Sequence, residues 1–93
     1  MKNHDLHLYI NGETLVSLEA IEILTAICRD KLQGRYKLEI IDIQEQPDRA
    51  EEAGILAIPT LIRNWPLPVT RIIGALTVKS RVLAGLGIPS LES

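Results

Sequence analysis

The sequence contains one cysteine, three aromatic residues and no apolar run approaching the ~20 residues of a membrane-spanning helix. A lone Cys28 forms neither an internal disulfide nor a metal site shared with a second cysteine. Cys28 belongs to a set of residues at the spacing of a buried helix face, which predicts a small core side chain. The set is Leu18, Ile21, Leu24, Cys28 and Leu32.

An excess of positive charge is also lacking. Ten Lys and Arg residues against twelve Asp and Glu give a net charge of −2, and no basic cluster forms a phosphate-binding stripe. Tyr9, Tyr36 and Trp65 are too few for a stacking platform, so we expect no nucleic-acid partner. The first residues show no signal-peptide pattern, and we expect a cytoplasmic protein that does not bind membranes.

What is present is a globular composition, 46% apolar and 24% charged, in 93 residues. This length supports one domain over residues 1–93 and is too short to enclose a deep catalytic cleft with a cofactor. His4 and His7 are possible metal ligands, but no Asp, Glu or Cys pattern completes a site. We therefore expect neither a metal nor a cofactor.

Hydrophobic periodicity predicts elements in the order βαβαββα. Apolar alternation marks the strands, and we expect Ser17 and Thr77 to be the N-caps of the first and last helices, with Gly34 ending the first helix and Gly54 the second. The ranges are 6–10 (strand), 17–34 (helix), 36–43 (strand), 47–54 (helix), a strand, turn and strand within 55–74, and 77–87 (helix). This is the order of the thioredoxin fold, in which a parallel βαβ half precedes an antiparallel hairpin and a closing helix.

The stretch ILAIPTLIRNWPLPVTRIIG, residues 55–74, carries three prolines within two predicted strands. Proline removes a ladder hydrogen bond, so Pro59, Pro66 and Pro68 belong at a strand start, a turn or an exposed edge. Ile58-Pro59-Thr60 resembles the pattern with which thioredoxin-like domains place a cis proline before their third strand. The alternative is an ordinary trans proline at a strand start.

A thiol-exchange enzyme of this fold needs Cys-x-x-Cys between the first strand and the first helix. That loop reads NGETLVS and contains no thiol, and Cys28 lies well downstream of it. The sequence therefore predicts a thioredoxin-like fold without redox activity, and a protein that is not an enzyme.

Three longer motifs resemble the KaiB family: YINGETLVSLEAI, YKLEIIDIQEQPDRAEEAGILAIPTL and LPVTRIIGALTVKSRVLAGL. The similarity implies a metamorphic α/β domain, in which a ground-state KaiB fold and a thioredoxin-like fold share their first half. The ground state would be a homodimer or homotetramer. The thioredoxin-like monomer would bind KaiC, a hexameric ring ATPase, and modulate its ATPase and phosphorylation cycle in circadian or stress-adaptive signalling. No G-x-x-x-x-G-K-[ST] occurs here, so the ATP belongs to the partner.

Carried over residue by residue, the resemblance implies partner-binding roles for four charged residues: Glu51, Glu52, Arg63 and Arg71. Gly54 and Thr70 stand where the family often has basic residues, which favours a KaiC-like ring different from the cyanobacterial one. Lys37 and Glu39, on the strand edge that would meet KaiA, differ from the usual residues and argue against KaiA as a partner. Four positions in the half that rearranges are expected to be structural or fold-switch residues: Pro59, Gly74, Gly85 and Gly87.

Two other hypotheses stay open. A thioredoxin-like sensory or protein-interaction module, similar to the input domain of the clock output kinase, would bind the same ring without changing fold. A thiol or glutathione enzyme is disfavoured by the absence of cysteine from the active-site loop.

Glu51 and Glu52, as neighbours on a helix, point apart and form a solvated or docking face rather than a catalytic pair. Trp65 is either a plug over the core or an exposed anchor at an oligomer contact.

Overall fold

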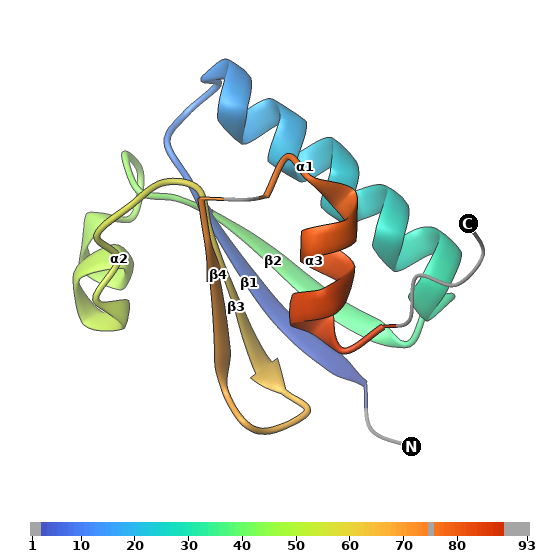
Figure 1. The fold of residues 1–93 in the computed structure, drawn as a ribbon. Coiled ribbons are helices and arrows are strands. Elements are labelled where there is room, and N and C mark those ends of the chain that lie inside the picture. The colour runs from blue at the N-terminus through green and yellow to red at the C-terminus, as the bar shows by residue number, and fades with distance from the viewer. Residues whose placement is uncertain (1–2, 75, 89–93) are drawn as a thin grey trace.

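The computed structural model describes residues 3–74 and 76–88. It contains a four-stranded sheet with helices on both faces (Figure 1). The elements follow the predicted order βαβαββα of a thioredoxin-like α/β domain, and the second, ground-state fold stays a prediction. Their bounds are β1 His4–Ile10, α1 Leu15–Ile27, a π-helical turn η1 Cys28–Leu32, β2 Tyr36–Asp42, α2 Pro47–Ala53, β3 Thr60–Trp65, β4 Thr70–Ile73 and α3 Lys79–Leu86. Among these described helices, none is long and apolar enough to cross a membrane.

The strands lie in the order β2-β1-β3-β4. β1 runs parallel to β2 and antiparallel to β3, and β3 runs antiparallel to β4. At the centre of the sheet, Leu8 lies between Ile40 of β2 and Leu61 of β3. β1 therefore joins a parallel βαβ half to an antiparallel hairpin, as the thioredoxin order predicts.

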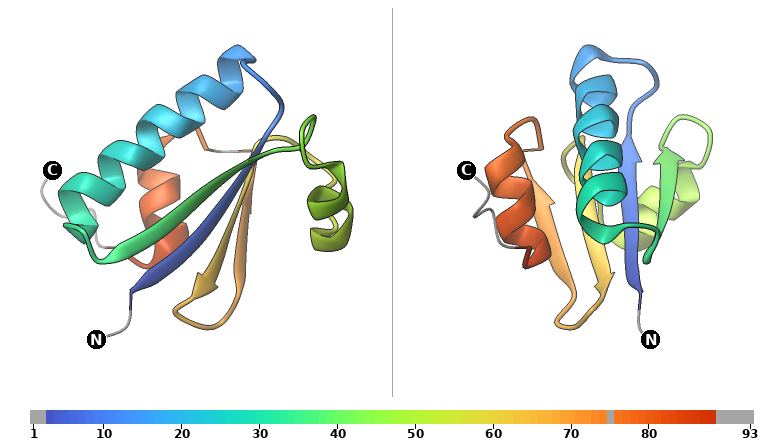
Figure 2. Two further views of the ribbon diagram at one scale, coloured as in Figure 1. Left: turned by 180° about the vertical axis from the view of Figure 1, so that it is seen from behind. Right: turned by 90° about the vertical axis from the view of Figure 1, so that its right-hand side faces the viewer.

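Strand alternation divides the core between the two faces of the sheet. Leu6, Leu8 and Ile10 of β1 pack in the larger core together with side chains of α1 and α3, which cover one face (Figure 2). Residues of the opposite parity form a smaller core on the face where α2 packs: Tyr9, Ile41 and Ile62. One apolar alternation in β1 thus positions all three helices.

The first helix begins earlier than predicted. Thr14, not Ser17, is its N-cap, and Thr14 Oγ1 accepts a hydrogen bond from the backbone N–H of Ser17 at 3.4 Å. The Ser17 hydroxyl is buried and accepts from Asn11 N at 3.2 Å and from Thr14 Oγ1 at 2.8 Å. Leu18 is 47% exposed, against the prediction, because the helix turns Ser17 and Leu24 toward the sheet instead. Three other predicted positions are buried: Leu24, Cys28 and Leu32.

The remaining helix ends depend on backbone conformation. α2 has Pro47 at its start and stops at Gly54, which has φ 68°, as predicted. α1 continues through η1 to Leu32, and the left-handed C-cap is Gln33 with φ 50°, one residue before the predicted stop at Gly34. α3 differs, because Val78 rather than Thr77 is the N-cap. Val78 keeps an extended backbone and makes no side-chain capping hydrogen bond, so the helix starts one position late.

The three prolines of residues 55–74 all follow cis peptide bonds. The cis prediction for Pro59 is confirmed, and the trans alternative is wrong. Pro59 is buried immediately before β3, where the Thr60 hydroxyl donates to Ala57 O at 2.6 Å. Pro66 and Pro68 lie in the turn between β3 and β4, so neither removes a hydrogen bond from the interior of the sheet.

Leu8→Ala should lower the free energy of unfolding by about 2–5 kcal/mol, because β1 would lose a fully buried side chain and leave a cavity. Leu56→Ala is the matched control: Leu56 is 99% exposed, and the same substitution should change stability by less than about 0.5 kcal/mol. Urea unfolding followed by far-ultraviolet circular dichroism measures both variants. Equal losses would contradict the placement of the core.

Candidate functional site

The loop between β1 and α1 occupies the place where redox enzymes of this fold carry their cysteines. Here it is fastened to the loop after β2: Asp42 Oδ1 accepts from Gly12 N at 3.1 Å, and Gln44 Nε2 donates to Asn11 Oδ1 at 2.7 Å. Cys28 is fully buried just after α1, and burial raises the pKa of its thiol to about 11. A buried, protonated thiol is a poor nucleophile at neutral pH, so this region offers no thiol chemistry.

The two histidines considered as metal ligands contact different parts of the chain. His4 Nε2 lies 3.4 Å from the carbonyl oxygen of Leu86, whereas His7 lies beside Glu39. Within residues 3–74 and 76–88, no three His, Cys, Asp or Glu side chains group closely enough to hold a metal ion.

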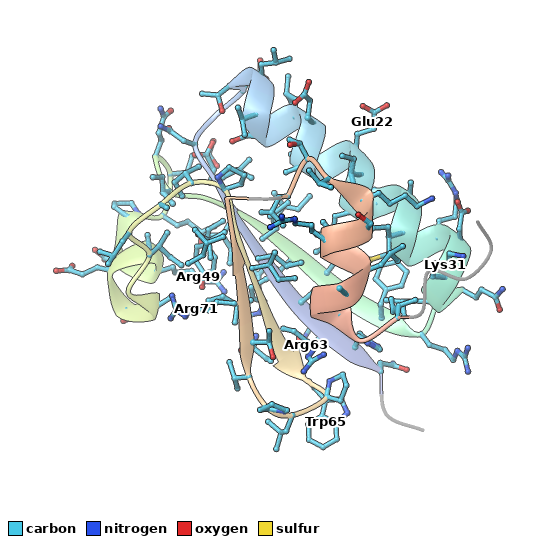
Figure 3. The ribbon with its side chains drawn as sticks, viewed as in Figure 1. Glu22, Lys31, Arg49, Arg63, Trp65 and Arg71 are labelled. Carbon is cyan, nitrogen blue, oxygen red and sulfur yellow. The ribbon has the colours of Figure 1, made fainter. Side chains whose placement is uncertain are left out.

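Three of the four predicted partner-binding residues lie around α2. Glu51 and Glu52 are exposed in the carboxyl-terminal half of this helix. Arg71, from the neighbouring end of β4, donates hydrogen bonds to the carbonyl oxygens of Ala53 and Gly54 (Figure 3). A guanidinium at this position satisfies carbonyls that the helix end leaves free and interacts favourably with the helix dipole.

An exposed apolar side chain completes this region. Leu56 is 99% exposed in the loop that follows α2. We call Glu51, Glu52, Leu56 and Arg71 the α2-end surface. A leucine that is almost fully exposed gains free energy when a partner covers it, which makes it a candidate contact of a protein-binding surface. Sequence reasoning missed Leu56, because its motif ILAIP reads as the beginning of a strand.

Arg63, the fourth predicted partner-binding residue, points to the opposite face of the sheet and is only 9% exposed. Its guanidinium donates to Pro68 O and Thr70 Oγ1, both at 3.0 Å, and to Gly85 O at 3.3 Å. Arg63 therefore ties the turn of the β3–β4 hairpin to α3. Its side chain is engaged within the chain in this arrangement, and the nearby Trp65 is half-buried at the end of β3.

Three of the four predicted structural positions lie at the ends of elements in the second half, and the fourth, Gly85, lies inside a helix. Pro59 precedes β3, and Gly74 follows β4 with φ 80°. Gly85 lies inside α3, where a Cβ atom would stand 2.3 Å from Ile72 Cδ1, so the absence of a side chain permits close packing of helix and sheet. Gly87 ends α3 with φ 73°. Their part in a second arrangement of the chain stays a prediction.

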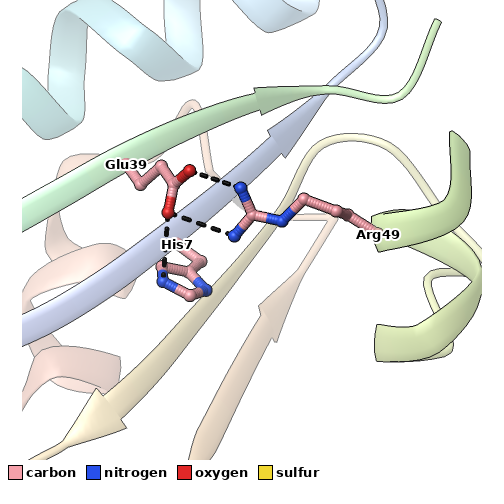
Figure 4. Close-up of polar contacts among 3 residues, drawn as sticks. All are labelled: His7, Glu39 and Arg49. Atoms are coloured by element: carbon pink, nitrogen blue, oxygen red, sulfur yellow. Dashed lines mark hydrogen bonds and ion pairs between the residues drawn. The ribbon is translucent and has the colours of Figure 1, made fainter. Parts of the chain in front are cut away.

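A charged cluster links β1, β2 and α2 on the α2 face of the sheet (Figure 4). Arg49 of α2 donates from both terminal nitrogens to the two carboxylate oxygens of Glu39, with Nη2 at 3.1 Å from Oε1. His7 Nε2 lies 3.6 Å from the same carboxylate. The hydrogen bond from Arg49 holds the pKa of Glu39 below its usual range. The sequence alone hides this cluster, because it depends on the register that sets His7 beside Glu39.

Solved structures with the same arrangement establish the class of fold. The chain is similar to the N-terminal domain of SasA from Synechococcus elongatus, with TM-score 0.66 and 17% identity over 94% of this chain and 86% of that one. It is also similar to the thioredoxin Deadhead of Drosophila melanogaster, with TM-score 0.73 and 12% identity over 92% of this chain and 80% of that one. The fold is therefore thioredoxin-like.

The sequence comparisons specify the family within that class. The family model of the KaiB domain matches residues 7–88. The circadian clock protein KaiB3 of Synechocystis sp. is 47% identical over 83 residues, which cover 89% of this chain and 81% of the relative. The circadian clock oscillator protein KaiB of Synechococcus elongatus is 45% identical over 87 residues, covering 94% and 85%. This chain belongs to the KaiB family, as the sequence motifs predicted.

Arg63→Met should lower the free energy of unfolding by about 1–3 kcal/mol, because three acceptors around a nearly buried guanidinium lose their donor. Arg71→Met, the same substitution at an exposed arginine, should cost less than about 1 kcal/mol. Urea denaturation of both variants compares the two positions. A larger loss for Arg71→Met would show that the hairpin is not held as described.

Arg49→Gln should raise the pKa of Glu39 toward its ordinary value, since the dominant hydrogen bond to the carboxylate is lost. The folded-state pKa of Glu39 lies below the unfolded one, so the pair stabilises the fold at neutral pH and loses this effect as pH falls through the folded-state pKa. Carboxyl chemical shifts in an NMR titration report the value. Arg29→Gln, which removes the partner of Asp30, is the control and should leave Glu39 unchanged. An unaltered Glu39 titration in Arg49→Gln would refute the assignment.

Proposed function

We propose that this chain is a non-enzymatic regulator that docks through the α2-end surface on a KaiC-like hexameric ATPase ring and modulates its ATPase and phosphorylation cycle. Membership of the KaiB family and the circadian clock names of its relatives support a clock-type regulatory role. The observation that carries the docking site is Leu56, an almost fully exposed leucine two residues after Gly54, whose carbonyl accepts a hydrogen bond from Arg71. Such a side chain gains most from being covered by a partner.

Charge at this surface favours a particular kind of ring. Glu51 and Glu52 carry negative charge, while Gly54 and Thr70 leave Arg71 as the basic member of the α2-end surface. Charge complementarity mainly governs association rate and specificity. We therefore propose a ring whose docking face presents more positive charge than the cyanobacterial ring, in a circadian or stress-adaptive pathway. KaiA is not part of this proposal.

The proposal includes a second arrangement of the chain, in which it self-associates as a homodimer or homotetramer. The thioredoxin-like arrangement would be the form that binds the ring. Exchange between the two would require the contacts of Arg63 with Gly85 O and of Arg71 with Ala53 O and Gly54 O to open. A slow step in complex formation is the expected consequence.

A second candidate is a thioredoxin-like protein-interaction module that binds without changing fold. The observation that favours it is the similarity to the N-terminal domain of SasA, which shares this arrangement. The two candidates differ in kinetics. A module already in its binding form associates at a rate proportional to ring concentration, whereas a fold switch sets a ceiling on the rate.

The test is size-exclusion chromatography with light scattering on the protein, the KaiC-like ATPase of the same organism and ATP, sampled over hours. The wild type should enter the ring peak slowly and change the ATPase rate of the ring. Leu56→Ala should weaken binding about tenfold or more, because the exposed apolar side chain of the α2-end surface is lost. Leu67→Ala, an exposed leucine in the β3–β4 turn, is the matched control and should bind as the wild type does.

Absence of a ring complex would overturn the proposal. Equal binding by Leu56→Ala and the wild type would remove the α2-end surface as the docking site. Association whose rate rises without limit with ring concentration would favour the interaction module over the fold switch.

A further inference from the structure

Asn11 and Gly12 form the turn between β1 and α1. β1 ends at Ile10, and α1 begins at Leu15. Asn11 O accepts a hydrogen bond from Thr14 N at 3.5 Å, and Gly12 has φ 57°, a left-handed conformation that favours glycine. Both residues of the pair are partly exposed, so solvent water has access to the turn.

An asparagine followed by glycine can modify itself. Because glycine has no Cβ to shield its backbone nitrogen, Gly12 N can attack Asn11 Cγ. The new N–Cγ bond closes a cyclic imide while the Cγ–Nδ2 bond breaks, and Nδ2 leaves as ammonia with the proton of the Gly12 N–H. Solvent water then opens the imide at either carbonyl carbon, which leaves aspartate or isoaspartate at position 11. The reaction needs no cofactor and no change of oxidation state.

In the folded chain, the two reacting groups are held by different partners in the loop after β2. Asn11 Oδ1 accepts from Gln44 Nε2 at 2.7 Å, whereas Gly12 N donates to Asp42 Oδ1 at 3.1 Å. Asp42 Oδ1 also accepts from Gln44 N at 2.9 Å, so the two partners are bonded to each other. We call Asp42 and Gln44 the clasp.

Further contacts restrict the movement that cyclisation requires. Asn11 N donates to the hydroxyl oxygen of the buried Ser17 at 3.2 Å, which fixes the backbone on the other side of the turn. A Cβ atom on Gly12 would stand 3.3 Å from Gln44 Oε1, so the Gln44 amide lies close to both members of the pair. Asn11 Cγ can turn toward Gly12 N only when the bond to Gln44 opens.

We propose that Asn11 is a latent deamidation site, whose cyclisation onto Gly12 is held back by the clasp and proceeds when the clasp opens. Gln44 acts by geometry, because it keeps Asn11 Oδ1 turned toward the loop after β2. Asp42 acts by charge, because Gly12 N must lose its proton during the attack and a neighbouring carboxylate disfavours the negative charge that develops there.

Deamidation would change the turn permanently. Either product places a second carboxylate beside Asp42, and both carboxylates then face Gln44. Isoaspartate also adds a methylene carbon to the main chain between β1 and α1. We therefore expect the modified turn to loosen. In the Asn11→Asp variant, which mimics one product, the amide of Gly12 should exchange with solvent faster than in the wild type.

This site is separate from the proposed ring contact. Asn11 and the clasp belong to the loops that follow β1 and β2, and none of these residues is part of the α2-end surface. A failure of ring binding would leave the deamidation rates unchanged. A failure of the deamidation proposal would likewise leave the Leu56 contact as proposed.

Incubation of the full chain at mildly alkaline pH, followed by peptide mapping with mass spectrometry, locates and quantifies each deamidation. In the folded wild type, Asn11 should convert at least about tenfold more slowly than in the same chain unfolded by urea, because opening of the clasp precedes the reaction. In urea, Asn11 should convert ahead of Asn3 and Asn64. These two precede His4 and Trp65, whose side chains hinder the same attack.

Variants of the clasp test its two members. In the folded chain, Gln44→Ala should convert about five- to tenfold faster than the wild type, as expected for the loss of one hydrogen bond. Gln46→Ala is the matched control, since the Gln46 side chain is exposed and makes no capping hydrogen bond to α2. Asp42→Asn keeps an oxygen that can accept from Gly12 N but removes the charge, and it should also convert faster.

A further variant separates local opening from unfolding of the whole chain. Arg63→Met removes contacts of the hairpin with α3 and leaves the clasp untouched. It should therefore convert at the wild-type rate, although it lowers the free energy of unfolding. Acceleration by Arg63→Met equal to that by Gln44→Ala would show that Asn11 reacts from the unfolded chain, and the role of the clasp would be wrong.

Three other results would overturn the proposal. The first is a folded wild type that converts at Asn11 as fast as the chain in urea. The second is a Gln44→Ala variant that converts at the wild-type rate. The third is slower conversion in Asp42→Asn, which would make Asp42 a base that assists the attack instead of a charge that opposes it.

Discussion

The pairing of β1 with β3 is the contact on which this arrangement depends. It is the only junction in the described sheet between the βαβ half, residues 4–42, and the later hairpin. Leu8 opposite Leu61 faces α1 and α3, and Tyr9 opposite Thr60 faces the side of α2. Because alternate residues of one strand serve two cores, a shift of β3 by one residue would expose both cores at once. The register of this pair therefore fixes which surfaces α2, Leu56 and Arg71 present.

Local chemistry explains how much of the fold is predictable from the sequence. α2 is predictable nearly to the residue, because Pro47 and Gly54 each act on their own backbone. The exposure of Leu18 is not predictable in this way. Apolar spacing gives the period of α1, but the sheet decides which side of the helix faces inward, and a buried Ser17 satisfied by Asn11 and Thr14 takes the place of an apolar contact.

The residues of the candidate site likewise differ in how far the local sequence predicts their positions. Residues that are neighbours in sequence, such as Glu51 and Glu52, are found from the motif because their exposure follows from one helix. Arg63 donates a hydrogen bond to Gly85 O only because α3, 22 residues later in the sequence, packs over the hairpin. No local sequence pattern predicts this contact. The Glu39–Arg49 pair likewise depends on where α2 lies over the sheet. Long-range contacts thus decide whether a charged side chain is bonded within the fold or is exposed for binding.

Arg63 and Arg71 stabilise the present arrangement of the second half through hydrogen bonds that can break without disrupting the sheet. Arg63 and Arg71 donate mainly to backbone carbonyls, and those carbonyls belong to turns and helix ends rather than to the sheet. Hydrogen bonds from a charged donor each contribute on the order of 1.5–3 kcal/mol, similar to the few kcal/mol that separate two packings of a fold-switching chain. For the proposed exchange, breaking the contacts of a single arginine is therefore comparable with the whole difference between the two states. The side-chain hydrogen bonds of both arginines end on residues of the second half, whereas Arg63 also pairs with Leu6 in the β1–β3 ladder, so the proposed exchange would have to act on that junction as well.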